Sequence, residues 1–471
     1  MYKDRAVLSN LVMMTFLFLS ISPAQGMKSY DQEVCTAFAK VDCDNKPFIF
    51  AIQEGKVRRI IMKSKKDKKD ILFLCQFFYP EYNSSATLPF DTAKYLANNG
   101  FSVSALCGYP KEYNTSGNVP LKETVEGVEI ERIRYVELDR KKKINRLINY
   151  FSFTLAALVK VGKLRSYKSV IVYSNPPVLP IVPIIAKKLF GTKFLFVAYD
   201  IYPEVAYASK TLKSGDVIDR VMKCINKSLY KNVAHVISLT DEMKRFLLEN
   251  RKNLTSDRIT TIANWAHEKK QIPDEDAYKR FGYKNGQFVV SYFGNMGTCQ
   301  DMDTLIQAAE LLKDDNRVRF LIVGHGNKKE QVQNEILNKR LKNVQQLDFL
   351  HGKDFEQAVA ISSCCVVSLE KGLKGTCAPS KYYSYLQGGH AVLGIVEKDS
   401  YLAKEINEKE IGFAVEIGDY NGLKNYIIKM ENNIHATVKM GQNALKLYRE
   451  KYDYNLAMKK YKNVFINILK M

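Results

Sequence analysis

The stretch TCAPSKYYSYLQGGHA, residues 376–391, indicates a loop that runs into a helix and, after two glycines, into a new strand. Pro379 suits the first position of a helix, so Ser380 and Lys381 belong to the first helical turn. In that turn the unpaired backbone N–H groups and the positive end of the helix dipole face outward. A lysine there, directly after the strand-like CCVVSLE of residues 364–370, is well placed to hold a phosphate. A capped helix with a solvated lysine is the alternative interpretation.

Strands alternate with helices on both sides of this stretch, over residues 287–433. The strand-like segments are QFVVSYFGNMG, RFLIVGHG, VQQLDFL, CCVVSLE and AVLGIV, and helical patterns such as MDTLIQAAELLK separate them. Such alternation predicts a parallel, doubly wound sheet, whose ligands bind beyond the carboxyl ends of the strands. The turns at 294–297, 324–328 and 374–381 are therefore expected to line one edge of this sheet.

Two of these turns carry further candidates for a phosphate site. Gly294 and Gly297, in the GNMG turn, let the backbone approach a diphosphate closely. Lys328 opens the next helix and is expected to direct its ammonium group at the same phosphates, and Asn295 is a weaker candidate. Structural glycines and a solvated lysine are the alternatives, but three turns that converge on one edge favour a binding site.

The first half of the chain, residues 71–264, shows the same alternation. ILFLCQFF, FSVSALCG, GVEIERIRY, SVIVYSNPP, KFLFVAYD, AHVISLT and RITTIAN are strand-like, and continuous apolar runs are typical of strands covered on both faces. Residues 265–286 are polar without a core pattern and are interpreted as a linker. Residues 434–471 indicate two helices that pack back towards the first domain. The predicted architecture is α/β, with two doubly wound Rossmann-like domains that face each other across a cleft.

The first 70 residues differ from the rest. A basic start, an apolar segment and PAQG resemble a signal peptide or a short anchor, and residues 27–70 show no clear element before the basic run KVRRIIMKSKKDKKD. The alternative is a misassigned start, because Met62 opens a segment that leads straight into a first strand. Residues 1–70 are therefore a leader or a misassigned N-terminal extension.

The composition points to an anionic partner. Among 471 residues, 71 are basic and 50 acidic, which gives a net charge of +21. Such an excess suits nucleic acid, an anionic membrane or a phosphorylated substrate. The sequence has no zinc-type cysteine pair and no strong nucleic-acid fingerprint, so a membrane surface and a phosphorylated substrate are favoured over nucleic acid. The nine cysteines are scattered, and several fall in strand-like runs, as buried reduced thiols do.

Residues 71–433 resemble the glycosyltransferases of family 4, which have the GT-B fold, in the branch that builds bacterial surface polysaccharides. The resemblance is to the fucosamine transferase of O-antigen synthesis and to colanic acid glycosyltransferases. It rests on segments that occur in order along the chain: FLCQFFYPE, YSNPP, AYDIYPE, ISLTDEM, IANW, FGNMGTCQDMDTLIQAA, FLIVGHG and APSKYYSYLQGG. These segments are specific for the fold and the superfamily, and they do not identify the sugar.

The resemblance implies a retaining transfer from a nucleotide sugar (UDP- or GDP-linked), bound mainly to the second domain, without a required metal or other cofactor. The acceptor would lie on the first domain and would be a glycan, such as a lipid-linked sugar at the cytoplasmic membrane face in capsule, O-antigen or exopolysaccharide synthesis. Lys381, Lys328 and the GNMG amides would neutralise the leaving diphosphate.

Four residues of the first domain are expected to face the cleft. Asp200 and Glu204, in AYDIYPE, are the catalytic candidates that would orient acceptor or sugar hydroxyls, with a structural role as the alternative for Glu204. Glu81 and Asn175 are the further candidates for the acceptor side of the cleft, in the loops at 79–86 and 174–177.

One position departs from the family pattern. Many members carry two glutamates eight positions apart, and here Thr376 and Ser384 occupy those positions. The second glutamate usually binds the ribose hydroxyls, and losing its charged hydrogen bond costs about 1.5–3 kcal/mol. Either Glu370 replaces it or the donor binds weakly.

A basic, aromatic-bearing segment follows residue 139 and suits the surface of an anionic membrane. Its residues are Arg140, Lys141, Lys142, Lys143, Arg146, Leu147, Ile148, Phe151 and Phe153. A core helix after a solvated loop is the alternative. Two other functions stay open: an exported two-lobe ligand-binding protein, if the leader is genuine, and a sugar-nucleotide epimerase of the same fold.

Overall fold

The computed structural model describes residues 68–110, 117–138, 143–267 and 271–470, together with the backbone of three strands before them. It contains two units, Met1–Lys68 and Lys69–Met471. In the first unit, β1 (Lys40–Cys43), β2 (Lys46–Gln53) and β3 (Lys56–Ile60) form an antiparallel sheet. The expectation of no clear element over residues 27–70 is therefore wrong for these strands. The apolar segment of the expected leader lies outside the described residues.

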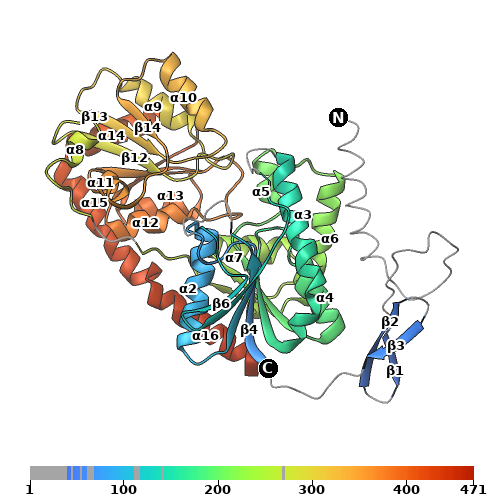
Figure 1. Cartoon of the computed structure of the whole chain (residues 1–471). Coiled ribbons are helices and arrows are strands. Elements are labelled where there is room, and N and C mark those ends of the chain that lie inside the picture. The colour runs from blue at the N-terminus through green and yellow to red at the C-terminus, as the bar shows by residue number, and fades with distance from the viewer. Residues whose placement is uncertain are drawn as a thin grey trace. The chain divides into compact units, whose positions relative to one another are not determined.

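The first domain of the second unit is built on an eight-stranded sheet in the order β11-β10-β9-β8-β4-β5-β7-β6 (Figure 1). Its strands are β4 (Lys69–Cys75), β5 (Val103–Gly108), β6 (Lys122–Val125), β7 (Val128–Ile133), β8 (Tyr167–Tyr173), β9 (Lys193–Ala198), β10 (His235–Ser238) and β11 (Ile259–Thr261). Its helices are α2 (Ser84–Asn98), α3 (Lys143–Val159), η1 (Val161–Ser166), α4 (Ile181–Phe190), α5 (Glu204–Ala208), α6 (Val217–Asn232), α7 (Asp241–Asn250) and η2 (Ser256–Arg258).

The apolar strands of this sheet lie where the sequence predicts them. The side chains of β5 are all buried, and those of β4 are buried from Ile71 onward, because both faces of a parallel sheet are covered by helices. The sheet is not purely parallel, however. β6 pairs antiparallel with β7 at the edge, and its KETV sequence alternates exposed and half-buried side chains. β6 has no apolar run, so the sequence pattern does not predict this strand.

The second domain is built on a six-stranded parallel sheet in the order β14-β13-β12-β15-β16-β17. Its strands are β12 (Phe288–Phe293), β13 (Val318–Val323), β14 (Val344–Leu347), β15 (Cys364–Ser368), β16 (Ala391–Ile395) and β17 (Gly412–Val415). Its helices are α8 (Ala277–Arg280), α9 (Asp303–Leu311), α10 (Lys329–Asn338), α11 (Gly352–Ala360), α12 (Ser380–Gly388), α13 (Tyr401–Glu408), α14 (Tyr420–Glu431) and α15 (Ile434–Leu447). Two hydrophobic clusters cover its two faces, in agreement with the prediction of a doubly wound sheet.

The range interpreted as a linker contributes to the core. Trp265, Ala277 and Phe281 are buried, and the last two join a hydrophobic cluster of the second domain. The expectation that residues 265–286 carry no core pattern is therefore wrong, since isolated apolar residues can fill gaps between elements without producing a periodic pattern.

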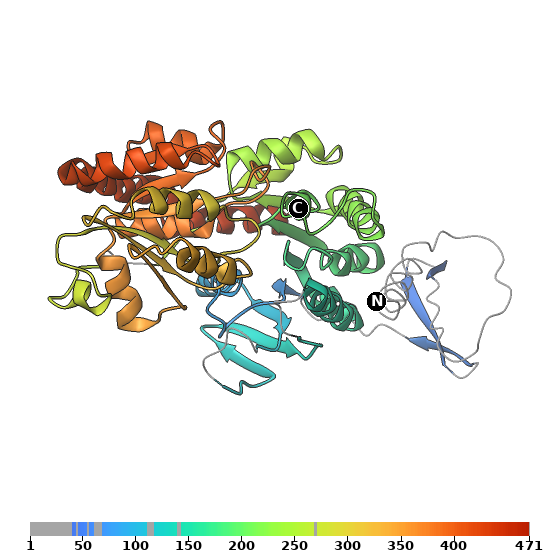
Figure 2. The ribbon, with the colours of Figure 1, turned by 90° about the horizontal axis from the view of Figure 1, so that it is seen from above.

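The C-terminal helices connect the two domains. α15 packs on α12 and β16 of the second domain, and a π-helical turn, η3 (Tyr448–Tyr452), leads into α16 (Tyr454–Lys470). α16 buries Met458, Tyr461 and Phe465 in the core of the first domain, and Figures 1 and 2 show the chain crossing between the domains here. The Nζ of Lys193 also donates to the carbonyl oxygen of Ile468 at 3.1 Å.

Candidate functional site

Two strands of the second domain diverge where the predicted phosphate turns lie. β12 and β15 pair only through Val290 with Cys364 and Ser291 with Cys365, and the chain winds outward in opposite directions from these strands. Such a topological switch point opens a crevice in a doubly wound sheet. The turn after β12 and the segment after β15 both reach it, which brings residues far apart in the sequence together.

Lys381 lies in the segment after β15, at this switch point. Its Nζ lies 3.8 Å from the ring centroid of Tyr292 and donates to the Tyr292 hydroxyl. Within the described part of the chain, no carboxylate forms an ion pair with Lys381. Burial lowers the pKa of Lys381 to about 7, because a low-dielectric surrounding disfavours the charged ammonium. Among the described residues, Lys381 is therefore held by an aromatic ring and a hydroxyl group and not by a carboxylate.

The start of α12 adds hydrogen-bond donors beside Lys381. No side chain caps this helix, whose N-cap is Pro379. The backbone N–H of Tyr382 donates to the carbonyl oxygen of Pro379 at 3.2 Å, but those of Ser380 and Lys381 precede it in the first turn. The rings of Tyr382 and Tyr383 are buried beneath the helix and fix its orientation. A helix start without a side-chain cap has backbone N–H groups that can bind an anion, and Lys381 lies in the same turn.

Gly294 faces the same ammonium group. Its φ of 120° favours glycine, and a Cβ at this position would lie 3.6 Å from Cε and 3.8 Å from Nζ of Lys381. A side chain at position 294 would therefore lie against the end of the Lys381 side chain.

The GNMG turn does not offer the amide cradle that the sequence predicts. The N–H of Gly294 donates to the carbonyl oxygen of Val323 at 2.9 Å, and the N–H of Gly297 donates to Oε1 of Gln300 at 3.0 Å. The N–H of Met296 donates to a carbonyl in the next turn at 2.6 Å. These three donors are occupied by the end of β13, by the turn after it and by the Gln300 side chain. The Asn295 side chain folds over Gly297, where an added Cβ would meet Nδ2 at 2.5 Å.

Lys328 and Glu370 pair with each other. Nζ of Lys328 lies 2.5 Å from Oε1 of Glu370 and donates to the carbonyl oxygen of Gln300 at 2.7 Å. The expectation that Lys328 points at the phosphates is not met in this arrangement, because a carboxylate already holds it. Glu370 is the candidate to replace the glutamate expected at position 384, and it follows β15 near the switch point. Its carboxylate is already paired with Lys328.

Ser380 and Ser384 lie one helical turn apart on α12, on the same face. Ser384 is half-buried. The hydroxyl of Ser380 accepts from the hydroxyl of Ser84, at the start of α2, at 3.5 Å. Two helix starts from different domains therefore meet at the crevice.

Asp200 reaches the second domain from the carboxyl end of β9. It forms an antiparallel bridge with Cys377, and the N–H of Ile201 donates to the carbonyl oxygen of Thr376 at 2.7 Å. The Ser174 hydroxyl accepts from the backbone N–H of Asp200 at 3.0 Å. Burial raises the pKa of Asp200 to about 6. Asp200 is expected at the cleft. Its bridge partner, Cys377, lies four residues before Lys381 in the sequence.

Glu204 has a different environment. Both of its carboxylate oxygens accept from Nη2 of Arg251, at 2.8 and 2.7 Å. This ion pair ties α5 to the end of α7. The geometry therefore supports the structural alternative for Glu204.

Glu81 and Asn175 lie at the switch point of the first domain, in the turns after β4 and β8. Glu81 is buried, and its Oε2 accepts from the backbone N–H of Phe78 at 3.4 Å. The Oδ1 of Asn175 is buried without a hydrogen-bond partner among the described residues. Both residues therefore lie at the same carboxyl edge of the sheet as Asp200, which follows β9.

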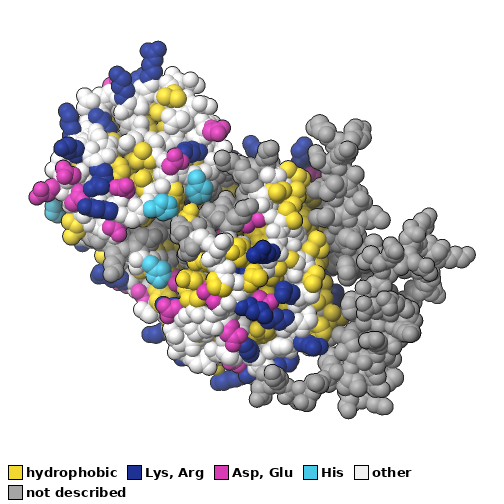
Figure 3. Space-filling model, viewed as in Figure 1, with side chains coloured by type: hydrophobic (Ala, Val, Ile, Leu, Met, Phe, Trp, Pro, Cys, Tyr) yellow, Lys and Arg dark blue, Asp and Glu magenta, His cyan; other side chains and the backbone are white. Residues whose placement is uncertain are grey.

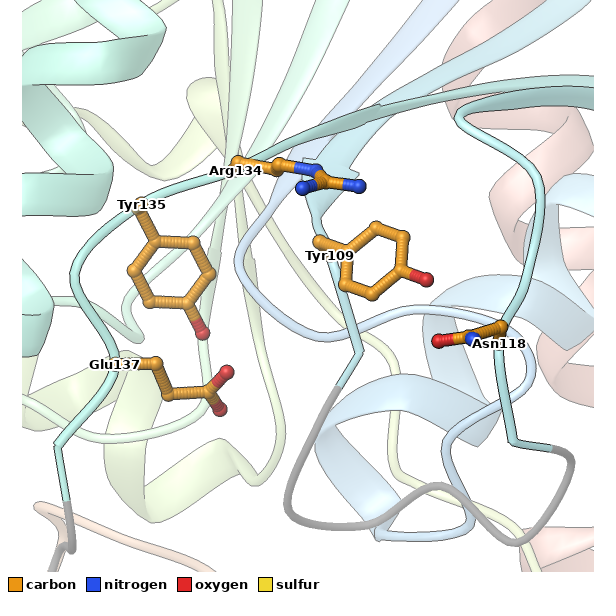
Figure 4. Close-up of a pocket in the computed structure, with 5 residues that line it drawn as sticks. All are labelled: Tyr109, Asn118, Arg134, Tyr135 and Glu137. Carbon is orange, nitrogen blue, oxygen red and sulfur yellow. The ribbon is translucent and has the colours of Figure 1, made fainter.

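Two features escaped sequence analysis. Tyr292 was within a quoted strand, but only the fold shows that its ring supports Lys381. A cavity of about 420 Å³ also lies at the carboxyl ends of β5 and β7 (Figure 4). Figure 4 shows Tyr135 and Glu137 on one side of it and Tyr109 and Asn118 on the other, and the Arg134 guanidinium lies 5.3 Å from the Tyr109 ring centroid.

The described residues contain no group of three or more His, Cys, Asp or Glu side chains arranged to hold a metal ion. Over the same residues, no helix is both long and apolar enough to cross a membrane.

The second domain matches a known family. Residues 274–447 match the model described as glycosyl transferases group 1. The chain is 23% identical over 303 residues to the probable glycosyltransferase WbjE of Pseudomonas aeruginosa, over 64% of this chain and 75% of WbjE. It is 22% identical over 260 residues to the putative colanic acid biosynthesis glycosyl transferase WcaI of Escherichia coli, over 53% of this chain and 63% of WcaI.

Solved structures share the two-domain fold. Sucrose-phosphate synthase from Thermosynechococcus elongatus superposes with a TM-score of 0.68 at 15% identity, over 85% of this chain and 100% of that one. HepE of Anabaena, solved in complex with UDP-glucose, superposes with a TM-score of 0.63 at 16% identity, over 85% and 100%. The chain has the GT-B fold, and its second domain is similar to the glycosyl transferases of group 1.

Proposed function

We propose that this protein is a retaining glycosyltransferase that moves a sugar from a nucleotide sugar to a glycan acceptor in the synthesis of a surface polysaccharide. One observation carries the proposal. Lys381, without a carboxylate partner in the described part of the chain, lies beside the uncapped start of α12 at the switch point of the second domain. That arrangement binds a diphosphate and stabilises the charge that develops as the diphosphate leaves.

The donor would bind the second domain. The diphosphate lies between Lys381 and Gly294, Ser380 contributes a hydroxyl, and Ser384 is one turn further along α12 towards the ribose. UDP is the first nucleotide to test, because HepE was solved with UDP-glucose, and GDP is the second. Lys328 and Glu370 would bind the donor as a pair. In this proposal Lys381 and the start of α12 neutralise the diphosphate, and no cofactor is required.

The acceptor would bind the first domain. Asp200 is mainly ionised at neutral pH, since its pKa is about 6, and accepts a hydrogen bond from a reacting hydroxyl. Glu81 and Asn175 line the same edge. The cavity around Arg134 lies three to four strands from β9, which is about 14–19 Å along the edge, so it would bind a more distant part of the glycan.

We also propose that the enzyme works in the cytoplasm at the inner membrane face, where a lipid-linked acceptor is available. Figure 3 shows hydrophobic side chains among lysines and arginines on the first domain, and Ile144, Leu155 and Val159 of α3 are exposed. The residues expected to contact the membrane differ in part from those that are exposed. Phe153 is buried in the core, and Arg140, Lys141 and Lys142 lie outside the described residues.

A thermal-shift panel tests the donor site. The full chain is incubated with UDP, GDP, ADP and dTDP beside a Lys381→Ala variant. A nucleotide at 100 times its dissociation constant stabilises the fold by about 2.7 kcal/mol. We expect UDP or GDP to raise the Tm of the native chain and not that of the variant. Absence of any shift with all four nucleotides contradicts the proposal.

A further inference from the structure

The segment before α12 is held by the other domain. Residues 375–379 lead from the second domain's sheet to Ser380 and Lys381. The carbonyl oxygen of Thr376 accepts from Ile201, and Cys377 bridges to Asp200, both in the first domain. The donor-binding end of α12 is therefore positioned partly from across the cleft.

Glu242 of α7, also in the first domain, supplies the third contact. Its Oε2 accepts from the backbone N–H of Gly375 at 3.1 Å, and its Oε1 accepts from the backbone N–H of Tyr401 at 3.1 Å. One carboxylate thus joins two separate segments of the second domain. Tyr401 opens α13, so the negative charge also lies at the positive end of that helix.

The surroundings of Glu242 make this contact specific. The side chain is buried, with 8% of its surface exposed. Gly375 has a φ of 70°, and a Cβ there would lie 3.3 Å from Cβ of Phe246, on the same helix as Glu242. Any side chain at Gly375 would push α7 away. A charged group that is buried and hydrogen-bonded through both oxygens is costly to disrupt.

We infer that Glu242 is a positioning residue for donor binding: it fixes residues 375–379, and thereby Lys381, only while the two domains are closed. The inference rests on the proposed function, since it assigns Lys381 to the donor diphosphate. Domain opening would break both hydrogen bonds of Glu242 and release the start of α12. Nucleotide affinity and domain closure are then coupled through this carboxylate.

The test uses Glu242→Gln in the full chain, with UDP as the probe, or whichever nucleotide the panel selects. The amide keeps one oxygen but turns an NH2 group towards a backbone N–H, so one hydrogen bond is lost. We expect the dissociation constant for the nucleotide to rise about tenfold. Glu249→Gln is the matched control: it removes the same charge from an exposed position on the same helix and should leave the affinity unchanged.

A double-mutant cycle separates positioning from a general loss of stability. If Glu242 acts through Lys381, then Glu242→Gln weakens nucleotide binding in the native background and adds nothing in a Lys381→Ala background. Additive effects, or a lowered Tm with unchanged nucleotide affinity, overturn the inference. If Glu242→Gln does not fold, Gly375→Ala perturbs the same contact from the other domain and should raise the dissociation constant in the same way.

The two proposals fail in different ways. If the native chain binds no nucleotide, the proposed function fails. If the native chain binds a nucleotide and Glu242→Gln binds it equally well, only the coupling through Glu242 fails.

Discussion

The two domains share one winding pattern, yet the carboxyl edges of their sheets carry different charged side chains. In the second domain, Lys381 and the start of α12 face the crevice, and Lys328 lies beside it. In the first domain, the same edge carries Glu81 and Asp200. Both sheets start from a central strand, β4 or β12, and wind outward in both directions.

The comparison shows which part of a doubly wound domain determines its chemistry. The apolar strands are interchangeable in character, and the turns after them carry the difference. A cationic crevice suits a diphosphate, whereas an anionic crevice suits hydroxyl groups that need orientation. Four predictions test this division of roles, from the largest expected effect to the smallest.

Asp200→Asn tests the role of the acidic side chain in the first domain. Removing the ionised carboxylate should lower turnover of the nucleotide sugar about 10²–10⁴-fold, measured as nucleotide release, while the dissociation constant for the free nucleotide stays within twofold. The control is Glu204→Gln, which weakens the ion pair with Arg251 and should lower the Tm but not turnover. Equal losses of turnover in both variants would contradict the assignment of Asp200.

Lys381→Met tests the role of the basic side chain in the second domain. Loss of the charged contact to the diphosphate should weaken UDP binding about hundredfold, measured by calorimetry. Lys374→Met is the control, because that lysine lies on the same segment but pairs with Asp399. The Tm of Lys381→Met without nucleotide should not fall, since burial of an unpaired ammonium is itself unfavourable. A Lys381→Met protein that binds as well as Lys374→Met would rule out the site.

Ser384→Glu tests whether α12 also binds the ribose of the donor. It places a carboxylate where many family members have one, and a charged hydrogen bond to the ribose should tighten UDP binding about tenfold. Ser384→Ala provides the reference for loss of the hydroxyl. If the glutamate variant binds no better than the alanine variant, the ribose lies elsewhere, and Glu370 becomes the first residue to test.

The pH dependence of UDP binding should follow Lys381. Its pKa is lowered to about 7 in the free protein, so the ammonium is present below pH 7 and is progressively lost above it. A bound diphosphate requires the protonated form, so the dissociation constant should rise about fivefold between pH 7 and pH 8. A Lys381→Met protein should show no such rise, and a rise of equal size there would assign the titration to another group.

Sequence periodicity was sufficient for the architecture. Buried parallel strands leave continuous apolar runs, so most of the strands and the two-domain division could be predicted. Strand β6 was missed because an edge strand with polar side chains has no such run. Trp265 and Phe281 were missed for a related reason, since single apolar residues outside periodic segments do not reveal that they enter a core.

Local sequence patterns are enough to predict that Lys381 lies at a helix start after a strand and that Asp200 follows another strand. The partners of three charged side chains depend on the fold: Lys328 pairs with Glu370, Glu204 pairs with Arg251, and Glu242 accepts from Gly375. The difference lies in how far along the sequence the determining residues are. Helix starts and strand ends depend on neighbouring residues, whereas the partner of a charged group depends on which distant segments the fold brings within hydrogen-bond distance.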